Sequence, residues 1–347
     1  MEVDYIIIGN GLAGISFCEQ LKAHNKTFVV FDNHSQQSSA VAGGLYNPIV
    51  LKRFTSVWKS EEQLQMALPM YQALEQELGV KFDYKISVRR KFNSIEEQND
   101  WFTASDKPIL NTYLSPKIIK NENEAVNAPF GFGEVLNTGK IDVKGLMVHY
   151  RNALLKNNRF IEEAFDYEKL KISDDDVEYE KIKAKHIVFA EGFGVVKNPY
   201  FNNLPLVPTK GELLTIYASD LKIDYVLKGP VFLIPLGNDL YIVGATYEWD
   251  DTTHDLTEKA KNELSEKLKT LISCPFKITE QVAGIRPTVK DRRPLVGQHS
   301  THKNMFVLNG LGTRGVMIGP YLAKQLFDCI ENGVPLEKEI DIKRFAL

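Results

Sequence analysis

Three glycines close to the N-terminus have the spacing of a turn that binds phosphate. Gly9, Gly11 and Gly14 form the pattern Gly-x-Gly-x-x-Gly, and Asp32 follows further along the chain. In such a turn the first glycine permits a tight bend, the second lets the backbone approach a pyrophosphate, and the third lets a helix pack closely on a strand. The Asp32 carboxylate would accept hydrogen bonds from ribose hydroxyls and repel a 2′-phosphate, which favours FAD or NAD over NADP. The alternative is an ordinary strand-to-helix turn followed by a surface aspartate.

Three further glycine-rich segments favour FAD as the dinucleotide. Residues 38–48 are small and flexible enough to lie against a pyrophosphate and a flat ring, and residues 189–194 form a second strand-to-glycine turn. The N–H groups of residues 309–316 could face O2 and N1 of an isoalloxazine ring, where negative charge collects on reduction. Each segment alone could merely permit a tight loop, but the four in this order predict a flavin site.

These segments supply most of the candidate cofactor-binding residues. They are Gly9, Gly11, Leu12, Ala13, Gly14, Asp32, Asn33, Ser39, Ala40, Gly43, Gly44, Leu45, Ala190, Glu191, Gly192, Gly312, Thr313, Arg314, Gly315 and Val316.

The elements that position these turns alternate between strand and helix. Apolar runs and helical periodicity predict strands over 5–8, 27–31, 187–190 and 305–308, and helices over 60–79, 143–156, 258–270 and 319–331. The segment from about residue 80 to 140 is irregular and strand-like, and residues 213–249 are β-rich.

The α/β segments at the start, middle and end are therefore interrupted by two β-rich insertions. We predict an α/β fold with a discontinuous, Rossmann-like FAD-binding domain of residues 1–78, 140–206 and 276–347. An inserted substrate domain of α+β character, with a mostly antiparallel sheet, takes residues 79–139 and 207–275.

Composition excludes several other classes of protein. The 347 residues are 44% hydrophobic and 25% charged, which is ordinary for a globular protein with a sizeable core. The net charge of −3 implies no broad basic surface, so nucleic-acid binding is not expected. The three cysteines are far apart, and the start of the chain lacks the features of a signal peptide, so we predict a cytoplasmic protein without a membrane span.

Metal and nucleophile chemistry also find no support. The seven histidines fall outside the motifs and have no paired ligand spacing, so no metal site is expected. Gly-x-Ser-x-Gly is absent, which gives no sign of a serine nucleophile. Hydride transfer from a neutral amine needs no strong base, so these absences fit an oxidoreductase.

The motifs together resemble the D-amino acid oxidase superfamily of FAD-dependent amine oxidoreductases, which includes glycine oxidase and the oxidase domain of a tRNA-modifying enzyme. The resemblance spans nearly the whole chain. Beside the first glycine turn it rests on residues 42–45, 208–212, 242–246, 283–288 and 294–297.

The resemblance implies an enzyme that moves a hydride from the carbon next to an amine to flavin N5. The imine then hydrolyses, and oxygen is the expected electron acceptor. It also implies that Arg286, in Gly-Ile-Arg-Pro, holds the substrate carboxylate near the cofactor, since a guanidinium matches a carboxylate bidentately. A structural salt bridge is the alternative role. Phe165 would contribute backbone contacts beside the adenine, from a strand.

Two departures from glycine oxidase point to a bulkier or secondary amine. Phe232 stands where glycine oxidase-like proteins carry a tyrosine, so one hydroxyl that would grip the carboxylate is missing. Residues 312–315, Gly-Thr-Arg-Gly, look more like the tRNA-modifying oxidase.

The flavin-tethering cysteine of sarcosine oxidases is absent near residues 288–290, so FAD should bind noncovalently. The candidate substrate pocket is Tyr46, Phe232, Tyr247 and Arg314, although each aromatic could instead be core packing.

The resulting prediction is an FAD-dependent oxidoreductase that oxidises the C–N bond of an amino acid or related amine. Three alternatives stay open. The first is an oxidase acting on a modified tRNA wobble base, and the second an amine dehydrogenase that passes electrons to a quinone. The third is a flavin-binding protein that has lost catalysis.

Overall fold

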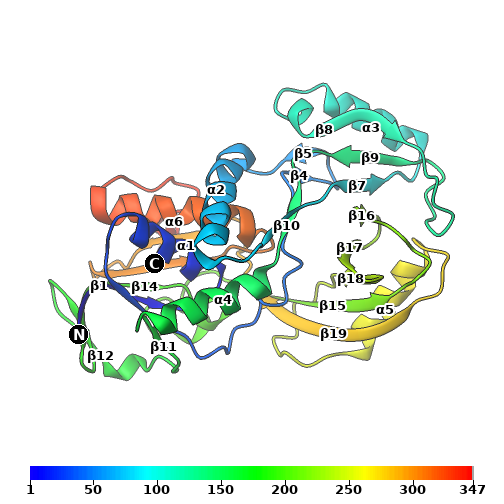
Figure 1. Ribbon diagram of the computed structural model, residues 1–347. Helices are drawn as coiled ribbons and strands as arrows, with labels where there is room; N and C mark the ends of the chain where they lie inside the picture. Colours follow the sequence, from blue (N-terminus) through cyan, green and yellow to red (C-terminus); the bar gives the residue numbers. More distant parts are fainter. Residues whose placement is uncertain (346–347) are drawn as a thin grey trace.

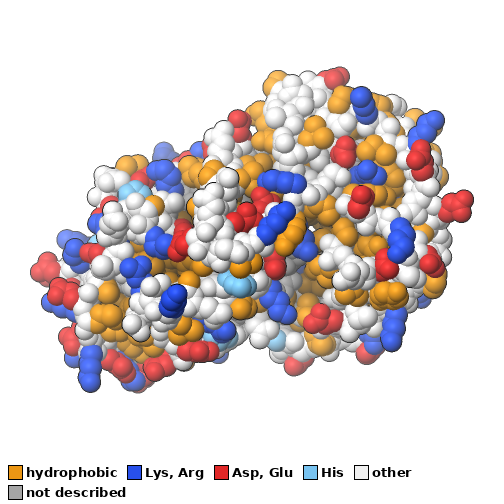
Figure 2. Space-filling view, in the orientation of Figure 1, with side chains coloured by type: hydrophobic (Ala, Val, Ile, Leu, Met, Phe, Trp, Pro, Cys, Tyr) orange, Lys and Arg blue, Asp and Glu red, His pale blue; other side chains and the backbone are white. Residues whose placement is uncertain are grey.

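The chain is organised by two eight-stranded sheets that lie side by side (Figure 1). The computed structural model describes residues 1–345. On the face drawn in Figure 2, acidic and basic side chains are interspersed over both parts of the molecule. None of the helices among the described residues is long and apolar enough to cross a membrane. The cytoplasmic location stays a prediction.

The first sheet contains the strand-helix-strand unit that the sequence predicts. Strand β1 is buried along most of its length between β2 and β14, and helix α1 (Leu12–Ala23) connects β1 to β2. These strands are parallel, as are β11 with β2 and β21 with β14. The sheet comprises β1 (Glu2–Ile8), β2 (Phe28–Phe31), β11 (Phe160–Ile161), β12 (Leu170–Ile172), β13 (Val177–Tyr179), β14 (Ile182–Phe189), β20 (Leu295–Gln298) and β21 (Met305–Asn309).

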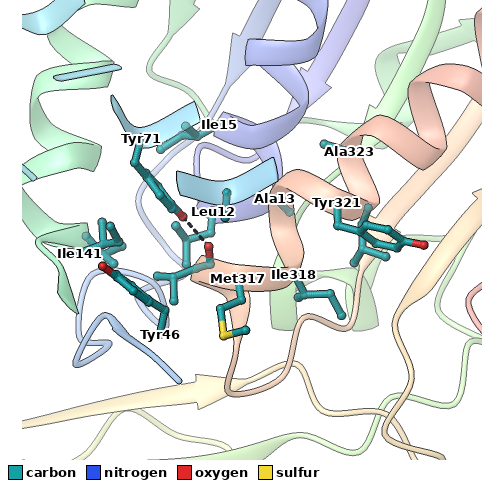
Figure 3. Close-up of a cluster of buried hydrophobic side chains, with 14 of the residues drawn as sticks. Leu12, Ala13, Ile15, Tyr46, Tyr71, Ile141, Met317, Ile318, Tyr321 and Ala323 are labelled. Atoms are coloured by element: carbon teal, nitrogen blue, oxygen red, sulfur yellow. Dashed lines mark hydrogen bonds between the residues drawn. The ribbon is translucent and has the colours of Figure 1, made fainter. Parts of the chain in front are cut away.

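Helices α2 (Ser60–Leu78), α4 (Val143–Lys156) and α6 (Gly315–Asn332) lie with α1 beside this sheet (Figure 1). Figure 3 shows the apolar cluster between them, in which the Tyr71 hydroxyl donates to the Val316 carbonyl at 2.9 Å. This bond ties α2 to the first turn of α6. It therefore fixes the end of α6 that follows the glycine-rich loop.

The second sheet is antiparallel except where β16 runs parallel to β7. Its strands are β19 (Lys277–Arg286), β15 (Thr209–Tyr217), β18 (Leu240–Gly244), β17 (Phe232–Gly237), β16 (Val226–Lys228), β7 (Val88–Lys91), β9 (Phe132–Val135) and β8 (Leu114–Ile119), in this spatial order. Helix α5 (Glu258–Lys269) packs on β15 and β18. The first sheet is mixed, because β12, β13 and β20 pair antiparallel in it. The predicted α/β fold with a mostly antiparallel second sheet is confirmed.

Short strands join the two parts. β10 (Gly139–Ile141) pairs with β3 (Leu45–Tyr46) and β6 (Asp83–Lys85), and β4 (Ile49–Val50) pairs with β5 (Thr55–Ser56). Residues 45–56, which include the end of the glycine-rich stretch 38–48, therefore form part of the junction between the two sheets.

Two details differ from the sequence-based expectation. Helix α3 (Ile95–Ser105) lies in the segment expected to be irregular and strand-like, and the Ser94 hydroxyl caps it by accepting from the Glu97 N–H at 3.2 Å. The Ser-x-x-Glu capping signal was present in the sequence. Strand β19 falls in the predicted FAD-binding part after residue 276, yet its partner throughout is β15 of the second sheet. The division into two domains stays a prediction.

Candidate cofactor and substrate site

A large cavity of about 960 Å³ runs from the carboxyl edge of the first sheet to one face of the second. The first wall is formed by the turns that follow β1, β2, β14 and β21. Ligands of open α/β sheets bind outside the carboxyl ends of the strands, so this edge is the expected position for a dinucleotide. The cavity volume is at the upper end of ligand pockets.

The first glycine turn brings bare backbone to this wall. Gly9 has φ +107°, and a Cβ there would lie 2.5 Å from the Ala190 carbonyl oxygen. A Cβ on Gly14 would lie 1.9 Å from the Gly9 carbonyl oxygen. Gly11 is the N-cap of α1 and makes no side-chain capping bond. The Leu12 N–H donates to the Ser39 hydroxyl at 3.3 Å, and the positive end of the α1 dipole faces the cavity, as a pyrophosphate requires.

Asp32, directly after β2, is held by two backbone donors. Its Oδ2 accepts from the Asn10 N–H at 2.6 Å and its Oδ1 from the His34 N–H at 2.6 Å. The carboxylate also lines the cavity. These bonds fix its orientation, and its remaining lone pairs can accept from ribose hydroxyls.

Glu191, after β14, is a second buried carboxylate on this wall. It accepts from Asn198 Nδ2 at 2.7 Å and from the Tyr167 hydroxyl. Burial raises the pKa of Glu191 to about 6, although both hydrogen bonds oppose the shift. The turn that starts at Glu191 is joined to the last loop, because Asn309 Nδ2 donates to the Gly192 carbonyl at 2.8 Å.

The loop from residue 309 to 316 ends at the N-terminus of α6. Gly310 and Gly312 have φ of +72° and +58°, which a side chain would disfavour. Arg314 is the N-cap of α6, and its Nη1 is buried without a hydrogen-bond partner among the described residues. The guanidinium lines the cavity.

Arg286, at the end of β19, enters the cavity from the second sheet. Its Nη1 donates to the Thr246 carbonyl at 3.2 Å, and its guanidinium lies 4.7 Å from the centre of the Tyr247 ring. Burial lowers the pKa of both Arg286 and Arg314, and the Tyr247 hydroxyl opposes that shift. Within residues 1–345 neither arginine has a carboxylate within 4.0 Å, so the predicted alternative of a structural salt bridge at Arg286 does not form.

The structure brings most of the predicted residues to this cavity. The lining includes Gly9, Gly11, Leu12, Ala13, Asp32, Asn33, Ser39, Gly43, Gly44, Leu45, Phe165, Ala190, Glu191, Gly192, Phe232, Tyr247, Arg286, Gly312, Thr313, Arg314, Gly315 and Val316. Their roles toward a ligand stay predictions.

Four predicted placements differ. Tyr46 is 2% exposed and does not line the cavity, because its hydroxyl points to Asp83, to which it donates at 2.7 Å. Gly14 packs behind the wall against Gly9, and Ala40 is absent from the lining. Phe165 lines the cavity from the loop after β11 rather than from a strand.

Sequence reasoning missed the floor that the second sheet supplies. It consists of alternate residues on neighbouring strands, namely Gly211, Leu213, Lys228, Ile234, Ile242, Gly244 and Gly284. Period-two alternation is the signal that could have found them, because every second residue of a strand faces one side. This alternation assigns the residues to the cavity only once the order of the strands is known.

The family model "FAD dependent oxidoreductase" matches residues 4–328. The chain belongs to this family of FAD-dependent oxidoreductases. Glycine oxidase of Bacillus subtilis is 26% identical over 156 residues, which span 43% of this chain and 42% of that protein. D-amino acid dehydrogenase of Helicobacter pylori is 24% identical over 343 residues, 94% of this chain and 75% of that protein. Among solved structures, glycine oxidase of Geobacillus kaustophilus has a TM-score of 0.78 at 18% identity, with 100% of this chain and 98% of that chain covered.

The residues present fit FAD. The first wall offers helix N–H groups, a Cβ-free approach at Gly11 and an oriented carboxylate at Asp32, which suit a pyrophosphate and a ribose. The loop before α6 adds a second helix N-terminus at the cavity.

Proposed function

We propose that this protein oxidises the C–N bond of an amino acid or a related secondary amine that carries a carboxylate. The observation that carries the proposal is the pair of largely buried guanidiniums, Arg286 and Arg314, which line the cavity without an acidic partner among residues 1–345. A buried charge without a counterion is costly unless a ligand supplies one. A carboxylated substrate supplies that charge beside the flavin site.

The side chains of the second wall would bind and orient the substrate. Arg286 holds the carboxylate through its planar fork, and Phe232 with Leu213 covers the apolar part of the substrate and excludes water. The substrate gives up two electrons and two protons across its C–N bond, and water then hydrolyses the resulting imine to a carbonyl compound and an amine. The chemistry that bound FAD supplies is acceptance of a hydride equivalent.

We also propose that FAD is held noncovalently. The three cysteines Cys18, Cys274 and Cys329 are free and do not line the cavity. Precipitation of the protein with acid is expected to release all of the flavin into the supernatant. Flavin that stays in the pellet would contradict this.

Molecular oxygen is the electron acceptor that we propose, on the strength of the similarity to glycine oxidase. The match to D-amino acid dehydrogenase along 94% of this chain favours an electron carrier as the second candidate. Rapid reoxidation of the reduced protein by air would exclude the carrier. Slow reoxidation by air and fast reoxidation by a quinone analogue would exclude oxygen.

An amine carried on a tRNA base is a second candidate substrate. The tRNA 5-methylaminomethyl-2-thiouridine biosynthesis bifunctional protein MnmC of Idiomarina loihiensis is 28% identical over 131 residues, 35% of this chain and 21% of that protein. The face drawn in Figure 2 carries both signs of charge, which favours the small substrate. Binding of tRNA that weakens steeply with salt would support the larger one.

The deciding experiment is an anaerobic screen of the FAD-loaded protein with D- and L-amino acids, N-methyl amino acids and cyclic amines. We expect at least one carboxylated amine to bleach the flavin absorption, while its decarboxylated analogue does so poorly. If no amine bleaches the flavin but dithionite does, the protein binds FAD without this activity, and the proposal fails.

A further inference from the structure

A lysine that the proposed chemistry does not use lies on the floor of the same cavity. Lys228 is the last residue of β16, is half-buried and lines the cavity. Its Nζ lies 4.6 Å from the centre of the Phe232 ring, so the ammonium leans over that ring. Within residues 1–345 it has neither a hydrogen-bond nor an ion-pair partner.

The register of the second sheet separates Lys228 from Arg286. Lys228 pairs with Phe232, Phe232 with Gly244, and Gly244 with Leu213 on β15. Arg286 lies on β19, beyond β15, four strand-to-strand steps away, or roughly 19 Å across the sheet at ~4.8 Å each, and it is further displaced along β19 from Val282, the register partner of Leu213. The two cations therefore lie on opposite sides of the floor.

The floor between these two cations is apolar. Leu213, Phe232, Ile234 and Ile242 line the cavity on the strands between β16 and β19. A ligand that reached both charges would cross this apolar strip with an uncharged part. The arrangement is that of two anion sites joined by a hydrocarbon spacer, not of one cluster.

The charges around Lys228 do not neutralise it. Arg90 on β7 is the register partner of Lys228 and is itself a cation. The carboxylate of Glu97 is paired with Arg90, and its Oε1 lies 2.5 Å from Nη2. Burial, followed by Arg90 and Lys267, lowers the pKa of Lys228 to about 8. The acidic residues of the cavity, Asp32, Glu163 and Glu191, all follow strands of the first sheet, on the other wall.

We propose that Lys228 binds a second anionic group of the substrate, so that the preferred substrates are amines with two acid groups. One carboxylate is held at Arg286, and a second carboxylate or a phosphate is held at Lys228 across the apolar strip. The inference rests on the proposed amine oxidation and names the substrate class of that site. Lys228 then determines specificity and takes no part in the redox step.

The first test compares matched pairs of substrates. Glutamate against glutamine, iminodiacetate against N-methylglycine, and O-phosphoserine against serine differ in one acid group. We expect wild type to have a lower KM for the diacid of at least one pair. The carboxylate and phosphate pairs distinguish the two sources of negative charge.

The second test uses Lys228→Met and Lys228→Arg, with Lys277→Met as control. We expect Lys228→Met to raise the ratio of the diacid KM to the monoacid KM at least tenfold, and Lys228→Arg to restore most of the preference. Lys277 is exposed at the start of β19 and is absent from the cavity lining, so its loss should leave the ratio unchanged. An unchanged ratio in Lys228→Met overturns the inference.

A binding measurement on wild type keeps the inference testable if the variants fold poorly. Glutarate and butyrate differ in one carboxylate and carry no amine, so neither can be oxidised. Calorimetric titration of the FAD-loaded protein should show tighter binding of glutarate, by about tenfold, at pH 7 and a smaller preference at pH 9, where Lys228 is mostly neutral. Equal affinities would overturn the inference. Failure of every carboxylated amine to reduce the flavin would instead overturn the proposed function.

Discussion

The two walls of the cavity are built in different ways. The first wall is backbone, consisting of the turns after β1, β2, β14 and β21, in which glycines with positive φ bring main-chain N–H groups to the surface. The second wall consists mainly of side chains on one face of the antiparallel sheet, beside the bare backbone of Gly211, Gly244 and Gly284. A wall of backbone suits a ligand that all members of a fold share, whereas a wall of side chains can be changed residue by residue to fit another substrate.

The walls also differ in charge. The acidic residues of the lining, Asp32, Glu163 and Glu191, belong to the first wall, which also carries Lys197 and Arg314, whereas the second sheet contributes Lys228 and Arg286. Asp32 on the first wall can accept hydrogen bonds from a ribose, and the basic second wall attracts an acidic substrate.

The largest effect is expected where the backbone wall is filled. In Gly14→Ala the new Cβ would lie 1.9 Å from the Gly9 carbonyl oxygen, so the turn and the start of α1 must move apart. We expect loss of FAD binding, measured as the ratio of flavin to protein after purification and by titration with FAD.

The control for this change is Gly333→Ala, which also adds a methyl group but after α6. That glycine has φ +65°, and a methyl group added there would meet no atom within 4 Å, so only backbone strain of about 1 kcal/mol is expected. If Gly14→Ala retains stoichiometric FAD, the backbone does not define the first wall.

The next effect concerns the side-chain wall. Arg286→Ala removes the guanidinium that lies beside Tyr247 and is expected to raise KM for a carboxylated amine about 100-fold, or ~2.7 kcal/mol, with FAD still bound. Arg286→Lys keeps the charge but loses the fork, so its KM should fall between the two. Unchanged KM in both variants would remove Arg286 from the substrate site.

The same contrast explains how much the sequence could predict. Gly9 and Gly14 were identifiable because only glycine fits their positions, whatever the rest of the fold does. Lys228 was not, because its place in the cavity depends on its pairing with Phe232 and on the order of five strands from distant parts of the chain. Tyr46 was misplaced because a motif neighbour can point to either side of a two-residue strand, and here Asp83 attracts its hydroxyl.

A smaller effect is expected from the buried carboxylate of the first wall. Burial raises the pKa of Glu191 to about 6. The contribution of this group to the free energy of unfolding is therefore complete at a pH below the pKa that it has in the unfolded chain, and it is lost as the pH rises through 6. Glu191→Gln keeps the shape without the charge. The free energy of unfolding of the variant, relative to wild type, should therefore rise by on the order of 1–2 kcal/mol between pH 4.5 and pH 8.

This pH difference is measured by urea unfolding at a fixed FAD concentration across that range. Asp32→Asn is a useful comparison on the same wall, because it removes a carboxylate that two backbone N–H groups hold in place. Parallel stability curves for wild type and Glu191→Gln would show that the buried charge has no cost on this wall.

The smallest effect tests whether a residue outside both walls is kinetically silent. Tyr46 donates to Asp83 at 2.7 Å and accepts from Lys85 at 2.8 Å, so Tyr46→Phe should cost about 1 kcal/mol of stability. KM and kcat should stay within twofold of wild type, whereas Tyr247→Phe, which removes a hydroxyl from the cavity lining, should change KM several-fold. Thermal unfolding and steady-state kinetics on the two variants separate the roles. A larger change of KM in Tyr46→Phe than in Tyr247→Phe would contradict this assignment. The substrate-binding wall would then include the junction strand that carries Tyr46.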